Sequence, residues 1–107
     1  MLSGKYLHGQ QPAGARITRW PDYIRYTSAE AVAATEAYVA LAQEHGLDPA
    51  QMALAYVNSR EFLTANIIGA TSMQKLQSNI ASIELTLSTD VLQAIEGIHQ
   101  RHPNPSP

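Results

Sequence analysis

Apolar residues recur every three or four positions in four stretches of this 107-residue chain, which is the period of an amphipathic helix. The first stretch begins at the capping-box pattern Thr27-Ser28-Ala29-Glu30 and ends near Gly46. The second begins at Asp48-Pro49, an N-cap followed by proline at the first helical position. The pattern therefore predicts two helices within residues 28–58. The apolar face of the first comprises Ala31, Ala34, Tyr38, Leu41 and Ala42.

A short apolar run precedes the other two helical stretches. Residues 65–70 read Ala-Asn-Ile-Ile-Gly-Ala, and such a continuous run ending at glycine is typical of a buried parallel strand. A helix is predicted over residues 71–83, capped by Thr71 or Ser72, and another over residues 88–101, after Ser88. Four residues of the 71–83 helix share one face, and we expect them to be core unless the rest of a barrel is absent: Met73, Leu76, Ile80 and Ile83.

The two ends of the chain lack a sustained hydrophobic period. Residues 1–27 are rich in glycine and proline, which predicts a long loop rather than a helix or strand. Residues 102–107 contain three prolines and cannot continue a helix.

One predicted strand cannot pair its backbone groups or bury its two faces without neighbouring strands. The run at residues 65–70 therefore indicates a piece of a larger sheet or barrel. Self-association and a wholly helical rearrangement are the alternatives.

Composition narrows the function classes. The chain has no cysteine, which excludes disulfides and thiolate metal sites, and it has no apolar stretch of the roughly 18 residues needed to span a bilayer. Residues 1–27 carry a net charge of +3 and the remainder −5. Four dispersed cations are few for a nucleic-acid surface but suit an anionic ligand, although a solvated loop would have the same composition. The pair His99 and His102 lacks a third ligand, so we expect no metal site.

Two separated segments together resemble a phosphate-binding site. Leu2-Ser3-Gly4-Lys5-Tyr6 places a lysine in a glycine-containing turn, and Ile67-Ile68-Gly69-Ala70-Thr71-Ser72 leads directly into a helix N-terminus. The free N–H groups of such a terminus favour anions. Neither segment is specific alone, and the interpretation depends on their combination and order.

These segments, with Pro12-Ala13-Gly14-Ala15-Arg16 and the helix start after Gly46, resemble the C-terminal third of an NADP(H)-dependent aldo-keto reductase. The likeness spans nearly the whole chain and is strongest to the branch that holds bacterial aldo-keto reductases and potassium-channel beta subunits. It implies an α/β fold, as the C-terminal fragment of a (β/α)8 TIM barrel, mostly helical as present, with residues 65–70 as the last barrel strand. It also implies that the chain needs the N-terminal half of the barrel.

The resemblance further implies NADPH as cofactor. Lys5 would reach the pyrophosphate, Arg16 the 2′-phosphate, and Asn79 the adenine, while Gly69 would permit close backbone approach. Thr71 would donate to a phosphate, and a cation at Lys75 would favour NADPH over NADH. The implied cofactor-binding set is Lys5, Arg16, Gly69, Ala70, Thr71, Lys75 and Asn79. Ser78 departs from the glutamate common before that asparagine, so this one adenosine contact of the family is not implied here.

The family's Asp, Tyr, Lys and His catalytic set belongs to the first half of the barrel, so no residue of this chain is assigned a catalytic role. The complete protein is expected to be a cytoplasmic oxidoreductase that reduces small-molecule aldehydes or ketones. A non-catalytic helical module and an inactive truncation are the alternatives. Trp20, Tyr23 and Tyr26 could form an aromatic wall for a ligand or could anchor the loop to its scaffold.

Overall fold

The computed structural model describes residues 1–106, and its principal helices begin where the capping residues predict. These are α2 (Ala29–Glu44), α3 (Pro49–Asn58), α4 (Met73–Ala81) and α5 (Thr89–Arg101). In each, the side-chain oxygen of the N-cap residue accepts a hydrogen bond from the backbone N–H three residues later. This N–H has no partner within the helix itself. The four N-caps are Ser28, Asp48, Ser72 and Ser88.

The prediction of an element-free loop over residues 1–27 is wrong in two places. A 3₁₀ turn, η1, spans Leu7–Gly9, and a one-turn helix, α1, spans Arg16–Arg19. The Tyr6 hydroxyl oxygen accepts a hydrogen bond from the backbone N–H of Ile17 at 3.2 Å, which ties the start of the segment to α1. This tertiary bond is not visible in the local sequence pattern.

The predicted strand at residues 65–70 does not form, and residues 1–106 contain no strand. The run instead crosses from α3 to α4 without regular structure, and the Ile67 side chain is 98% exposed. A lone extended segment has no neighbour to accept its backbone hydrogen bonds, so it cannot become a strand by itself. The α/β organisation that we expected is therefore not present within this part of the chain.

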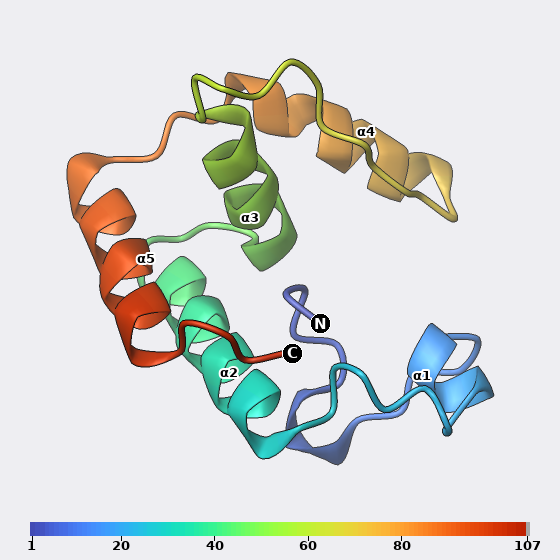
Figure 1. The fold of residues 1–107 in the computed structure, drawn as a ribbon. Helices are drawn as coiled ribbons and strands as arrows, with labels where there is room; N and C mark the ends of the chain where they lie inside the picture. Colours follow the sequence, from blue (N-terminus) through green and yellow to red (C-terminus); the bar gives the residue numbers. More distant parts are fainter. Residues whose placement is uncertain (107) are drawn as a thin grey trace.

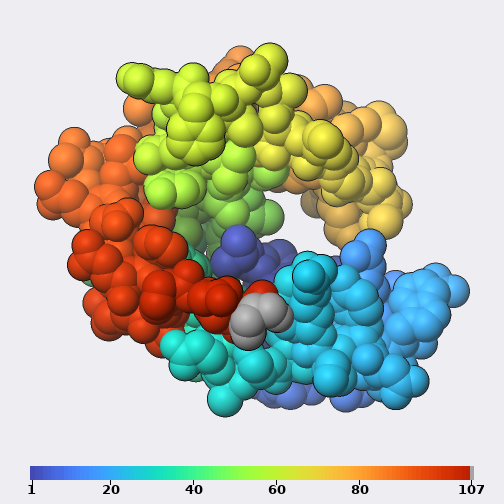
Figure 2. Space-filling model, viewed as in Figure 1, coloured from blue at the N-terminus to red at the C-terminus, as the bar shows by residue number. Residues whose placement is uncertain are grey.

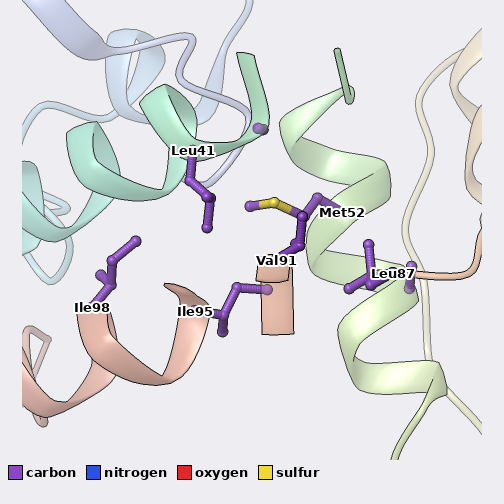
Figure 3. Packing of buried hydrophobic residues seen from close by; sticks show 8 residues of the cluster. Leu41, Met52, Leu87, Val91, Ile95 and Ile98 are labelled. Atoms are coloured by element: carbon purple, nitrogen blue, oxygen red, sulfur yellow. The ribbon is translucent and has the colours of Figure 1, made fainter. Parts of the chain in front are cut away.

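The hydrophobic core lies where α2, α3 and α5 meet (Figure 3). Leu41 from α2 and Met52 from α3 pack with Val91 and Ile95 from α5. Leu87, which precedes α5, is buried in the same cluster. A 3₁₀ turn, η2 (Ser82–Glu84), connects α4 to this core through its contacts with α3.

The expected core face of α4 is mostly exposed. Met73 (68%) and Ile80 (58%) of α4 and Ile83 (70%) of η2 are exposed, so the stripe, expected to be core unless the rest of a barrel is absent, is not buried within residues 1–106. Because α4 packs chiefly against α3 and η2, these side chains find no cover within residues 1–106. An exposed stripe is what the helical pattern predicts when the rest of a barrel is absent.

The elements surround an open centre, with α1 and α4 on opposite sides of the opening (Figures 1 and 2). The radius of gyration is 14.1 Å, against about 13 Å for a compact chain of this length. The larger radius is consistent with this opening, which lies between residues 1–27 and α4 (Figure 2).

Candidate functional site

A cavity of about 610 Å³ lies between the N-terminal loop and the start of α4. Its lining includes four of the residues that the sequence assigned to the cofactor: Lys5, Arg16, Thr71 and Lys75. The hollow in Figure 2 lies between these two parts of the chain. Residues more than fifty positions apart in the sequence thus reach one cavity.

Gly4 sets the turn that presents Lys5. Its φ of +74° lies in the left-handed region, and a Cβ built there would stand 3.1 Å from Cγ2 of Val39. Both the backbone conformation and the close approach to α2 therefore favour glycine. The turn is closed by a 2.8 Å hydrogen bond from the Gly4 N–H to the carbonyl of Met1.

The opposite wall is the first turn of α4. Ser72 caps this helix by accepting from the N–H of Lys75 at 3.2 Å, and the Lys75 ammonium donates to the Thr71 hydroxyl oxygen at 3.1 Å. Thr71 and Lys75 are both exposed and line the cavity at the start of the helix. The positive end of the α4 dipole adds to the lysine charge.

The cavity is electropositive. Four cations line it, namely Lys5, Arg16, Arg19 and Lys75, and no aspartate or glutamate of residues 1–106 does. Within the described residues the one close contact between a carboxylate and a basic side chain joins Glu30 to His102, outside this cavity. In this part of the chain the four cations thus have no carboxylate partner, which suits an anionic ligand with several phosphate groups.

The remaining three predicted residues do not line the cavity. Gly69 and Ala70 lie on the segment that leads to α4, and the space around a Gly69 Cβ is open. The Asn79 side-chain amide donates to the Gly69 carbonyl at 3.4 Å, so within this chain it supports the segment before α4.

Sequence reasoning did not assign Arg19 to the site. Arg19 ends α1, and its guanidinium lies 5.2 Å from the centre of the Trp20 ring, a cation–π contact. Trp20, Tyr23 and Tyr26 all line the cavity, and the two tyrosine rings are 5.9 Å apart. The structure thus places all three rings along the cavity. The positive charge of residues 1–27 was the signal for Arg19.

Two kinds of feature are absent from residues 1–106. No group of three His, Cys, Asp or Glu side chains is placed there to hold a metal ion. None of the helices in this range has both the length and the apolar character to cross a membrane.

Fold and cavity together define a helical chain with an electropositive cavity that aromatic rings partly line. The family model "Aldo/keto reductase family" matches residues 1–100, and the chain belongs to this family.

Three relatives illustrate the similarity. Protein tas of Escherichia coli (strain K12) is 49% identical over 106 residues, which cover 99% of this chain and 31% of that protein. L-glyceraldehyde 3-phosphate reductase of Escherichia coli O157:H7 is 32% identical over 104 residues, covering 90% of this chain and 29% of that protein. An aldo-keto reductase of Babesia bovis is 32% identical over 106 residues, which cover 95% of this chain and 36% of that protein. The chain spans about a third of the length of these relatives.

Proposed function

We propose that this chain supplies the adenosine and phosphate side of an NADPH site in a (β/α)8 aldo-keto reductase. The complete protein would reduce aldehydes or ketones to alcohols. The observation that carries the proposal is the cavity that brings Lys5, Arg16, Thr71 and Lys75 together with no carboxylate from residues 1–106 in its lining.

Each residue has a role that its chemistry supports. The Arg16 guanidinium offers a planar fork for bidentate contact with the 2′-phosphate, and Lys75 adds a second charge from the opposite wall. Lys5 would bind the pyrophosphate. The Thr71 hydroxyl oxygen accepts from Lys75, and its hydrogen is available to donate to a phosphate oxygen. In the proposed arrangement Gly69, Ala70 and Asn79 complete the adenosine side once neighbouring strands order residues 65–70.

NADPH supplies the hydride for carbonyl reduction. The part played by this chain is to bind and orient the cofactor, and the rings of Trp20, Tyr23 and Tyr26 line the same cavity. Proton transfer to the carbonyl oxygen is assigned to residues outside the third of the fold that this chain covers.

The test is a chimera in which residues 1–106 replace the matched third of Protein tas, with NADPH binding followed by cofactor fluorescence. The 49% identity makes this exchange conservative, and unmodified Protein tas is the positive control. We expect the chimera to bind NADPH with an affinity that falls as salt rises, because the contacts are charge-assisted. A folded chimera that fails to bind NADPH while Protein tas binds it would refute the proposal.

A second candidate function is a stand-alone binding module, because four cations from separate parts of this chain, Lys5, Arg16, Arg19 and Lys75, line one cavity. Titration of the isolated 107-residue chain separates the two. An ordered monomer that binds NADPH in a salt-dependent manner favours the module, whereas aggregation without binding favours a piece of the barrel.

A further inference from the structure

The one-turn helix α1 presents two arginines to the electropositive cavity. Arg16 and Arg19 are the first and last residues of α1, and both line the cavity. Residues three positions apart on a helix are neighbours, with Cβ atoms about 5–6 Å apart. The two guanidinium groups therefore start from adjacent positions on the side of the opening that lies across from α4 (Figure 1).

Backbone hydrogen bonds fix the register of this turn. The Arg19 N–H donates to the Ala15 carbonyl and the Trp20 N–H donates to the Arg16 carbonyl, both at 2.9 Å. A further bond, to the Tyr6 hydroxyl oxygen, ties α1 to the start of the chain. The backbone thus holds the two arginines side by side.

Arg19 has no carboxylate partner within residues 1–106. Its guanidinium lies 5.2 Å from the centre of the Trp20 ring, and this cation–π contact attracts the charge without neutralising it. Like charges at neighbouring positions on a helix destabilise it, so Arg16 and Arg19 repel each other. An anion bound between the two guanidinium groups would relieve this repulsion.

The chemistry of NADPH indicates which anion fits a pair of arginines. A phosphate monoester carries a charge of about −1.5 to −2 at pH 7 and has three acceptor oxygens, so it can accept from two guanidinium groups at once. The 2′-phosphate is the monoester of NADPH, whereas each phosphorus of the pyrophosphate carries one charge and two free oxygens. The pair on α1 therefore matches the 2′-phosphate better than the pyrophosphate.

We propose that Arg19 binds the 2′-phosphate of NADPH together with Arg16, and so helps to set the preference for NADPH over NADH. This inference rests on the proposed function, and it adds to that site a residue that the sequence motifs did not assign. Trp20 positions the Arg19 guanidinium through the cation–π contact.

The test uses the chimera in which residues 1–106 replace the matched third of Protein tas. Arg19→Gln should weaken NADPH binding about tenfold, because charge-assisted hydrogen bonds are lost. NADH lacks the 2′-phosphate, so its affinity should fall by less than about threefold, the effect of a distant and screened charge. Retained NADH binding also shows that the variant is folded. Cofactor fluorescence measures both affinities.

The matched control is Arg25→Gln, because Arg25 is an exposed arginine of the same N-terminal segment and does not line the cavity. It should change both affinities slightly and equally, which gives the effect of net charge alone. Equal losses of NADPH and NADH binding in Arg19→Gln would overturn the inference while leaving the NADPH proposal standing. A folded chimera with Arg19 intact that fails to bind NADPH would instead refute the proposed function.

A double variant tests whether the two arginines share one phosphate. Groups that bind the same phosphate are coupled, so the loss of NADPH affinity in Arg16→Gln/Arg19→Gln should differ from the product of the two single losses. A loss equal to that product would place the two arginines on separate groups of the cofactor and overturn the inference.

Discussion

The Lys75 ammonium donates a hydrogen bond to the Thr71 hydroxyl oxygen, 3.1 Å away, across the first turn of α4. The bond fixes the lysine at the cavity wall opposite Arg16 and leaves two ammonium hydrogens and the threonine hydroxyl hydrogen available. Two neighbouring donors are thereby oriented before any ligand arrives, which lowers the ordering cost of binding.

Replacing Lys75 or Arg16 by alanine in the Protein tas chimera should weaken NADPH binding more than NADH binding. Each change removes a charge-assisted hydrogen bond worth about 1.5–3 kcal/mol, which corresponds to about tenfold or more in affinity. Fluorescence titration with both cofactors measures the difference.

Arg101→Ala provides the matched control for that titration, because Arg101 is an exposed cation in the last turn of α5 and does not line the cavity. It should leave both affinities unchanged. Equal losses for NADPH and NADH in the Lys75 and Arg16 variants would contradict contact with the 2′-phosphate.

Two methionines on different helices should respond differently to alanine. Met52 of α3 is 2% exposed within the core, whereas Met73 of α4 is 68% exposed. Met52→Ala should lower the free energy of unfolding by about 2–5 kcal/mol, because it removes buried apolar volume and leaves a cavity. Met73→Ala should change it by less than about 0.5 kcal/mol.

Urea unfolding of the chain, followed by helical circular dichroism, measures both variants. Because the same substitution is made in a helix each time, the difference in helix propensity largely cancels. Similar losses would mean that the face of α4 is packed in solution and that the core differs from the structure.

The helices were predictable because their signals are local. Ser28, Asp48, Ser72 and Ser88 each act through a bond to a backbone N–H three residues later, so the sequence alone contains both partners. The segment 65–70 was not predictable in this way. Its apolar run encodes a strand only if other strands lie beside it, and residues 1–106 provide none.

The lining of the candidate site was also predictable only in part. Lys5, Arg16, Thr71 and Lys75 follow from motifs that the family resemblance places, and the structure brings them to one cavity. Arg19 depends on the one-turn helix α1, which is held by the hydrogen bond between Tyr6 and Ile17, and no local pattern encodes that bond.

The isolated chain should self-associate through its exposed apolar segment between α3 and α4. Phe62 is 87% and Ile67 98% exposed, and such neighbouring large apolar side chains favour association in water. Ile67→Lys should shift the chain toward monomer, as measured by light scattering after size-exclusion chromatography. Thr64→Lys adds the same charge at a nearby exposed polar position and is the control. If both variants shift the mass equally, net charge rather than Ile67 governs association.

Tyr38 should contribute to a loss of stability at alkaline pH that Tyr38→Phe reduces. Burial raises the pKa of Tyr38 in the folded chain, and Tyr56 and Glu96 add to the effect. Below about pH 10, the ordinary pKa of tyrosine, both folded and unfolded chains hold the proton and no pH dependence arises. Above it the unfolded chain releases the proton first, so the free energy of unfolding falls as the pH rises toward the folded pKa. Urea unfolding across this range should show a shallower decline for Tyr38→Phe than for the unmodified chain. Parallel declines would mean that the Tyr38 phenol titrates alike in both states.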